Sequence, residues 1–178
     1  MKPKILCLPG SPRAHSTNAA LLNHFALAAE KLATVEVYRD LARLPIFNPD
    51  LEGLALPDII GSLETRIRSA DGLVIACPEY AHGIPGGFKN LLDWLVSGDA
   101  LYDKPTILIH ANGRGRGAFV RAALIEVLKT VGVNLIDTDA MSVYLVSKSP
   151  DAANEMLSEH ENRAKLAKAA RQFVEKLI

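Results

Sequence analysis

Short runs of apolar residues alternate with longer stretches in which apolar residues recur every three or four positions. The continuous runs are typical of parallel strands buried on both faces, and they lie at residues 4–8, 34–38, 72–77, 106–110 and 134–137. The stretches with helical spacing lie between and after them, at residues 18–32, 57–70, 85–96, 117–131 and from 149 to about 177. The pattern therefore predicts strands joined one to the next through helices.

Alternating strands and helices predict an α/β domain with a doubly wound parallel sheet. No linker, repeat or low-complexity segment divides the chain, so we expect a single domain over residues 1–178, with a long loop at 39–56. In such sheets ligands bind beyond the carboxyl ends of the strands. The loops after the first, third and fourth strands should therefore share one site. These loops begin near Pro9, Pro78 and Ala111, and each is rich in glycine.

The amino-acid composition limits which binding partners and which cellular compartment we expect for the protein. The 178 residues include 20 Lys plus Arg and 20 Asp plus Glu, a balance that argues against broad binding to nucleic acid or anionic membranes. Cys7 and Cys77 lie inside apolar runs and are expected to be buried, which suits a reducing cytoplasm. No signal peptide is visible and no apolar stretch approaches the ~20 residues of a membrane helix. We expect a cytoplasmic protein without membrane insertion.

The first glycine-rich loop has the composition of an anion site. Between the first strand and the first helix stand four small polar donors and one arginine: Ser11, Ser16, Thr17, Asn18 and Arg13. Amides at a helix N-terminus are unpaired and the helix dipole favours an anion there. One Ser or Asn would suffice as a helix cap, so this set exceeds the need of a cap and predicts a phosphate site.

The second glycine-rich loop, residues 78–90, has the features of a platform for a flat ligand. Pro78 and Pro85 stiffen it, and its glycines allow a backbone to approach a ligand closely. Tyr80 offers an aromatic face and His82 a further ring. Glu79 is expected to hold neighbouring backbone rather than to act as a general base.

One alternative is a phosphatase. Cys7 and Arg13 match the C-x5-R anion cradle of the low-molecular-weight tyrosine phosphatases, in which a thiolate attacks the phosphate. Three features oppose this assignment. Cys7 falls within a strand, Ala14 stands where Ser or Thr is expected, and the chain has no Asp-Pro pair to supply a general acid.

The third loop, residues 111–118, carries a second alternative. Gly113-x-Gly115-x-x-Ala118, with Asp137 after the next strand, matches a dinucleotide-binding fingerprint. Only about forty residues follow Asp137, too few to complete the usual dinucleotide domain. The loop's two arginines could instead attract a second anionic ligand. No cluster of His, Cys and carboxylates has the spacing of a metal site.

Two motifs together resemble a known family. Gly10-Ser11-x-Arg13-x-x-Ser16-x-Asn18 is similar to the phosphate loop of the NAD(P)H-dependent FMN reductases, which include soluble flavin, quinone and chromate reductases of bacteria. A longer motif is similar to their flavin-ring loop, and it reads Pro78-Glu79-Tyr80-x-x-x-x-Pro85-Gly86-x-Phe88-Lys89-Asn90-x-x-Asp93-Trp94. The likeness extends over nearly the whole chain.

The resemblance implies a flavodoxin-like three-layer sandwich, with a five-stranded parallel sheet in the order 2-1-3-4-5 and helices on both faces. It also implies FMN as cofactor. The residues that would hold the FMN phosphate are Ser11, Arg13, Ser16, Thr17 and Asn18. Those that would border the isoalloxazine ring are Pro78, Glu79, Tyr80, Ala81, His82 and Gly83, with Asn112 and Gly113 at its other edge. Many members have Asn where this chain has Ala81.

The activity implied is an FMN-dependent oxidoreductase. Hydride would pass from NADPH or NADH to FMN and then to a quinone, flavin, azo compound or chromate-type acceptor. The flavin carries the chemistry, so no catalytic side chain is expected. A non-catalytic flavodoxin-like electron carrier and a flavin-responsive regulatory protein are the alternatives. The resemblance also implies a homodimer or homotetramer, with residues 89–94 and 39–56 as the expected interface contributors.

Overall fold

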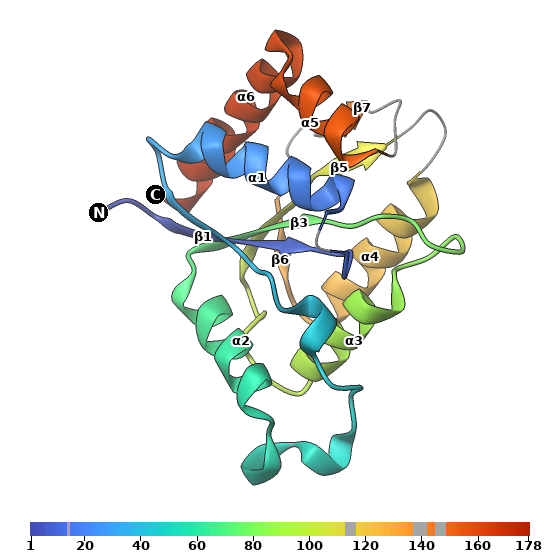
Figure 1. Ribbon diagram of the computed structural model, residues 1–178. Coiled ribbons are helices and arrows are strands. Elements are labelled where there is room, and N and C mark those ends of the chain that lie inside the picture. The colour runs from blue at the N-terminus through green and yellow to red at the C-terminus, as the bar shows by residue number, and fades with distance from the viewer. Residues whose placement is uncertain (14, 113–116, 137–141, 145–148) are drawn as a thin grey trace.

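The centre of the molecule is one parallel sheet in the strand order β2-β1-β3-β4-β6 (Figure 1). Its strands are β1 (Lys4–Pro9), β2 (Thr34–Val37), β3 (Gly72–Ala76), β4 (Pro105–Leu108) and β6 (Asn134–Leu135). The computed structural model describes all residues except 14, 113–116, 137–141 and 145–148. Because β6 is the fifth of the expected strands, the expected order 2-1-3-4-5 is confirmed, and it is the flavodoxin-like order.

Helices cover both faces of the sheet and complete the three layers (Figure 1). On one face lie α1 (Thr17–Ala29), α5 (Pro150–Ser158) and α6 (His160–Leu177). On the other lie α2 (Asp58–Ser69), α3 (Gly86–Leu95) and α4 (Ala118–Thr130). Every residue of β3 is buried, as the continuous apolar run at 72–77 predicts for a strand covered on both faces.

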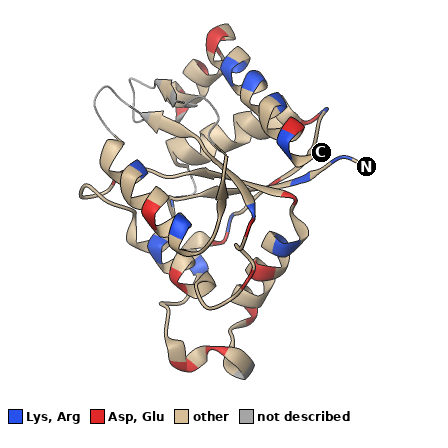
Figure 2. Cartoon of the chain, turned by 180° about the vertical axis from the view of Figure 1, so that it is seen from behind, with Lys and Arg blue, Asp and Glu red and all other residues tan. Residues whose placement is uncertain are grey.

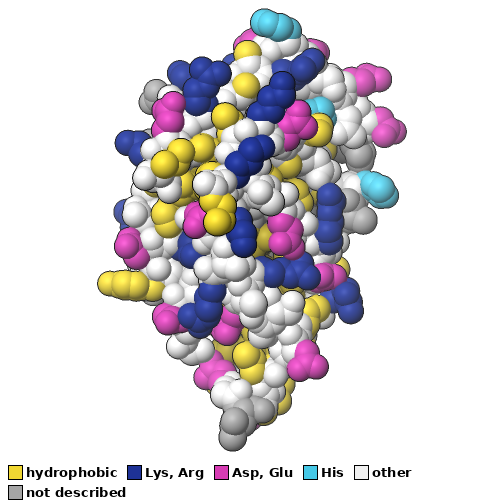
Figure 3. Space-filling model, turned by 90° about the vertical axis from the view of Figure 1, so that its left-hand side faces the viewer, with side chains coloured by type: hydrophobic (Ala, Val, Ile, Leu, Met, Phe, Trp, Pro, Cys, Tyr) yellow, Lys and Arg dark blue, Asp and Glu magenta, His cyan; other side chains and the backbone are white. Residues whose placement is uncertain are grey.

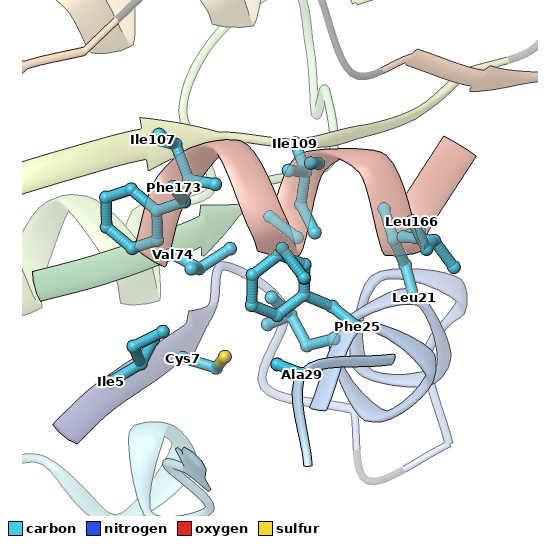
Figure 4. Close-up of a cluster of buried hydrophobic side chains, with 14 of the residues drawn as sticks. Ile5, Cys7, Leu21, Phe25, Ala29, Val74, Ile107, Ile109, Leu166 and Phe173 are labelled. Atoms are coloured by element: carbon cyan, nitrogen blue, oxygen red, sulfur yellow. The ribbon is translucent and has the colours of Figure 1, made fainter. Parts of the chain in front are cut away.

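Each face of the sheet has its own hydrophobic core. On the α1 and α6 side, Phe25 and Phe173 pack with Cys7, Val74 and Ile107 (Figure 4). On the opposite side the neighbouring strand residues point into the second core, because successive side chains of a strand face opposite ways. These two cores fix the register of the central strands, and therefore the level in the sheet at which each strand ends and its loop begins.

The segment 39–56 is held against α3 rather than being a free loop. The indole Nε1 of Trp94 and the Asn90 amide Nδ2 both donate to the Pro45 carbonyl, each at 2.8 Å. The Asn90 Oδ1 accepts from the Phe47 amide at 2.7 Å, and the Phe47 ring packs edge-on against Trp94. Three short 3-10 turns, η1 (Leu41–Arg43), η2 (Pro49–Leu51) and η3 (Gly53–Ala55), follow one another within it.

The single helix expected from residue 149 to 177 is wrong. The chain forms two helices, α5 and α6, separated at Glu159, whose backbone is extended with ψ 146°. The Asn162 Nδ2 donates to the Met156 carbonyl at 2.8 Å, and the Glu159 amide donates to the same oxygen at 3.2 Å, so both contacts tie the start of α6 to the end of α5. Because neither Pro nor Gly lies at the break, the sequence pattern gives no sign of it.

A second small sheet was also not expected. It pairs β5 (His110–Asn112) with β7 (Ser142–Tyr144) in parallel. The fourth strand, expected over residues 106–110, accordingly ends at Leu108 and the chain continues into β5. Three-residue strands depend on a partner distant in sequence, so periodicity does not reveal them.

Charges of both signs are interspersed over the molecule. Figure 2 shows both signs of charge along α2, and along α6 a run of Lys and Arg with acidic residues toward its ends. Helix α2 has Asp58 in its first turn and Arg66 and Arg68 in its last, the distribution that complements the helix dipole. In the part of the chain that the structure describes, no helix is both long and apolar enough to cross a bilayer.

Close packing at Gly72 gives a stability test. A Cβ at Gly72 would lie 2.7 Å from the Phe173 ring and 2.9 Å from Leu177, whereas a Cβ at Gly61 in helix α2 would find its nearest neighbour at 4.0 Å. We expect Gly72→Ala to lower the free energy of unfolding by about 1–3 kcal/mol through overpacking. Gly61→Ala should raise it by about 0.5–1 kcal/mol, because Ala is the better helix residue. Urea unfolding measures both, and a Gly72→Ala protein as stable as wild type would contradict the packing described.

Candidate functional site

The first loop places the N-terminus of α1 beside the carboxyl end of β1. Ser16 is the N-cap, and its Oγ accepts a hydrogen bond from the Ala19 amide at 3.0 Å. The Gly10 amide donates to the Ala76 carbonyl at 2.8 Å, and a Cβ at Gly10 would lie 2.5 Å from the Cys77 Sγ. Only glycine therefore allows the chain to leave β1 this close to β3.

The start of α1 is rich in donors and poor in acids. No Asp or Glu lies in its first turn. Ser11, Ser16 and Asn18 are buried, and Arg13 is exposed. The Asn18 Oδ1 is buried and has no hydrogen-bond partner among the described residues. A buried acceptor left unsatisfied carries a free-energy cost, which a ligand would relieve only by donating a hydrogen bond to it.

The structure opposes the phosphatase assignment. Cys7 is fully buried in the core beside Phe25, and burial raises the pKa of its thiol far above the usual range. A buried neutral thiol is inert, because the thiolate is the nucleophilic form. Cys77 is likewise buried, and burial raises its pKa to about 12. Ala14 lies outside the described residues.

The second loop contains a tight turn with strained backbone. The Tyr80 amide donates to the Gly83 carbonyl at 3.2 Å, and the Gly83 amide donates to the Tyr80 carbonyl at 2.9 Å. Between them Ala81 has φ 48° and His82 has φ 59°, a conformation that costs non-glycine residues free energy. In Figure 1 this turn is the hairpin at the end of the loop after β3.

Tyr80 brings the first two loops together. Its hydroxyl lies 3.3 Å from the Ser11 Oγ, although the two residues are far apart in sequence. The same Ser11 Oγ accepts from the Arg13 amide at 3.4 Å. The phosphate loop expected from the sequence and the aromatic residue expected to border a ring are thus direct neighbours.

Glu79 connects the second loop to the start of α4. Its Oε2 accepts from the Phe119 amide at 3.1 Å and from the Val120 amide at 3.3 Å, and its Oε1 lies 3.4 Å from the His82 Nδ1. Glu79 therefore holds neighbouring backbone, as expected. Helix α4 already has a carboxylate of the chain at its N-terminus, whereas α1 has none in its first turn. Of the two helix starts, α1 is the one left to attract an external anion.

Phe119 is a residue that the sequence analysis missed. Its ring meets the His82 ring edge-on, with centroids 4.7 Å apart, and it is 59% exposed. An aromatic residue in the first turn of the helix after the third loop was the available signal. With Tyr80, which is 44% exposed, Phe119 gives this edge of the sheet an accessible aromatic surface.

The third loop is described only at its ends. Asn112 is the last residue of β5, and Gly117, with φ 93°, precedes α4. Gly113, Arg114, Gly115 and Arg116, like Asp137 of the dinucleotide fingerprint, lie outside the described residues. The contact of Glu79 with the first turn of α4 places the end of this loop beside the second loop.

A groove elsewhere on the surface is distinct from this site. It encloses about 660 Å³ between the C-terminal half of α1 and helices α5 and α6, and its lining includes Leu27, His160 and Arg163. Figure 3, which views the left-hand side of the molecule in Figure 1, shows hydrophobic side chains among Lys and Arg. The groove lies at the opposite end of α1 from the predicted phosphate loop.

His110 is a buried titratable group at the carboxyl end of the sheet. It is 2% exposed, and neither ring nitrogen has a hydrogen-bond partner among the described residues. Burial, and to a smaller extent the nearby Arg121, lowers its pKa to about 4. The imidazole is therefore neutral in the folded protein at neutral pH.

Comparisons with known proteins agree with this arrangement. A family model described as NADPH-dependent FMN reductase matches residues 3–145. An NADH:(hydroxy)cinnamate reductase subunit, CrdA, of Vibrio ruber is 32% identical over 95% of this chain and 84% of its own length. The quinone reductase of Escherichia coli K12 is 32% identical over 64% of this chain and 62% of its own. The solved structure of FerB, a flavoenzyme NAD(P)H:(acceptor) oxidoreductase from Paracoccus denitrificans, superimposes with a TM-score of 0.83 at 23% identity, covering 98% of this chain and 97% of FerB.

The neutral burial of His110 predicts how stability depends on pH. In the unfolded chain this histidine binds a proton near pH 6.5, whereas in the folded protein it does so only near pH 4. The unfolded state thus binds more protons between these values, and stability falls as pH is lowered through them. We expect the free energy of unfolding of the wild-type protein to fall by about 3 kcal/mol over this pH range, since each pKa unit is worth about 1.4 kcal/mol. The His110→Leu variant should not show this loss. Parallel curves of unfolding free energy against pH for the two proteins would contradict it.

Proposed function

The chain belongs to the NADPH-dependent FMN reductase family, and from this we propose that it transfers hydride equivalents from NADPH or NADH, through FMN, to a small acceptor. The observation that carries the proposal is the meeting of the two motif loops, in which the Ser11 and Tyr80 hydroxyls lie 3.3 Å apart beside the start of α1. We propose further that residues 1–178 act as one FMN-binding domain.

The residues at the start of α1 suit the phosphate of FMN. Ser11, Arg13, Ser16, Thr17 and Asn18 would hold it, together with the backbone amides of the first turn. The lack of an acid in that turn supports this role. Hydrogen bonds between charged groups and their partners are the stronger kind, so a dianion gains more here than a neutral ligand would.

The isoalloxazine ring would lie against the second loop. Pro78, Glu79, Tyr80, Ala81, His82 and Gly83 would border one side, mainly through backbone groups, and Asn112 and Gly113 would border another. When bound, the flavin supplies the redox chemistry. The task of the chain is to fix the ring and leave one side accessible, and the exposed rings of Tyr80 and Phe119 are suited to receive a flat second substrate.

We propose that the acceptor is a quinone, a free flavin, an azo compound or a chromate-type anion, with quinones favoured by the named activity of the Escherichia coli relative. A second function also has support. The Vibrio ruber relative is named as a subunit, so this chain could pass electrons to a partner protein. The two functions differ in whether the isolated protein reduces a small acceptor at all.

We also propose a homodimer or homotetramer in the cytoplasm. Trp94 is buried within its own chain, where it holds residue 45, and is not free for a subunit contact. Ile46 lies between Pro45 and Phe47, whose backbone groups are hydrogen-bonded to Asn90 of α3, and its side chain is 86% exposed. Ile46 is therefore the better candidate for a subunit contact. The two free, buried cysteines support a reducing compartment.

Rapid-reaction kinetics tests the proposed activity. The FMN-loaded protein is mixed anaerobically with NADPH or NADH, and the absorbance of oxidised flavin near about 450 nm is followed, a property of the flavin itself. We expect fast, direct bleaching, followed by recovery on addition of a quinone. If the flavin stays oxidised until a separate reductase is added, the protein is an electron carrier.

Replacing Arg13 tests the phosphate contact. Arg13→Ala should weaken FMN binding by about tenfold or more, because a hydrogen bond to a charged group contributes about 1.5–3 kcal/mol. Arg43→Ala is the matched control, since it also removes one surface arginine, here one paired with Asp40. Fluorescence titration of FMN measures both. Equal dissociation constants for wild type and Arg13→Ala would refute the assignment.

A further inference from the structure

His82 is held from two sides at the edge of the proposed flavin pocket. Its Nδ1 lies 3.4 Å from the Glu79 Oε1, and its ring meets the Phe119 ring edge-on at 4.7 Å. Its side chain is nevertheless 76% exposed. Among the residues that the structure describes, Nδ1 is the ring nitrogen that has a partner, and Nε2 remains open to a ligand.

The backbone that carries His82 is strained. Ala81 and His82 both lie in the left-handed region, which is unfavourable for a non-glycine residue. Glycine would adopt this turn without that cost. Strain of this kind is typical of sites where a side chain must stand in one place. The turn also includes Tyr80, whose hydroxyl reaches Ser11, so it belongs to the same site as the phosphate loop.

Glu79 orients the imidazole of His82. The carboxylate is itself fixed by the Phe119 and Val120 amides, and its second oxygen faces the His82 Nδ1. A carboxylate beside one imidazole nitrogen holds the ring in one orientation and leaves the other nitrogen toward a ligand. The proton on Nε2 is then the one that the ring can give away.

We propose that His82 is the proton donor to carbonyl-type acceptors, a role that rests on the proposed function. Reduction of a quinone to a hydroquinone takes two electrons and two protons. The hydride equivalent from the reduced enzyme brings both electrons and one proton. The second proton moves from the His82 Nε2 to the quinone oxygen: the N–H bond breaks, the O–H bond forms, and the neutral imidazole regains a proton from water. Glu79 acts as the positioning residue.

The experiment compares two acceptors in the His82→Gly enzyme. Glycine preserves the turn, because His82 has φ 59°. The reduced FMN enzyme is mixed with either duroquinone or ferricyanide. Duroquinone is chosen because its ring carbons are all substituted, so that nucleophiles cannot add to them. Ferricyanide is chosen because it takes one electron and no proton. We expect reoxidation by duroquinone to slow by about tenfold or more, within the range of general acid catalysis. Reoxidation by ferricyanide should be unchanged.

Imidazole in solution and a variant away from the site serve as controls. Added imidazole should restore the duroquinone rate of His82→Gly, because the replacement leaves an exposed space of the right size. His160→Ala removes another exposed imidazole, in the groove beside α5 and α6 away from the proposed flavin pocket, so it should show neither the loss nor the rescue. A binding measurement uses the oxidised enzyme and durohydroquinone, followed by perturbation of the flavin spectrum. The dissociation constant of the His82→Gly variant should exceed that of wild type by up to about tenfold, which corresponds to the loss of one hydrogen bond.

The outcomes separate this role from the proposed function. The enzyme is reduced by light and a sacrificial donor, so the test of His82 does not depend on NADPH or NADH. A selective loss with duroquinone, rescued by imidazole, supports the proposal. Equal losses with both acceptors, no loss, or a loss that imidazole does not rescue would each overturn it. Failure of wild type to be reduced by either nicotinamide would overturn the proposed function and leave the His82 result standing.

Discussion

The site depends on where helix α1 begins. Helix amides that lack intrahelical partners carry a partial positive charge, and here they start just beyond the carboxyl end of the central strand β1. Two features fix that start. Gly10 lets the chain pass within contact of Cys77, and Ser16 caps the first turn. The two hydrophobic cores hold β1 in register from both faces, so the position of these donors follows from the packing of the whole sheet.

Helix α4 starts at the same edge of the sheet, and it has a carboxylate at its N-terminus that the first turn of α1 lacks. At the start of α4, the Glu79 carboxylate stands where an external anion would bind. Its Oε2 accepts from two backbone amides, and its Oε1 lies beside His82. One carboxylate thereby joins the second loop to the end of the third. The protein thus satisfies one helix start internally and leaves the other for a ligand, so that a rigid frame lies next to a site that favours a phosphate.

Much of this arrangement follows from local sequence patterns. Apolar runs indicated the strands of the central sheet, the resemblance to the FMN reductases implied their order, and glycine-rich loops marked the edge at which ligands are expected to bind. The role of Glu79 in holding backbone was expected because an isolated carboxylate in a loop is more often structural than catalytic. These features are set by periodicity and by residue chemistry close to each position, which a single sequence records.

Other features depend on contacts between distant residues. The break between α5 and α6 relies on Asn162 reaching back to Met156, and the β5–β7 sheet relies on pairing across many residues. The left-handed turn at Ala81 and His82 opposes the preference of both residues, so propensity points away from it. Phe119 enters the site because α4 is tied to Glu79. Tertiary packing, not local sequence, decides each of these.

Comparing the affinities of FMN and riboflavin tests the role of the α1 start most directly, because the two ligands differ only in the phosphate. Both are titrated against the apoprotein by quenching of flavin fluorescence. With several donors on one dianion, FMN should bind at least about a hundredfold more tightly, a difference of about 2.7 kcal/mol. Equal affinity for the two flavins would show that the phosphate is not held at the start of α1.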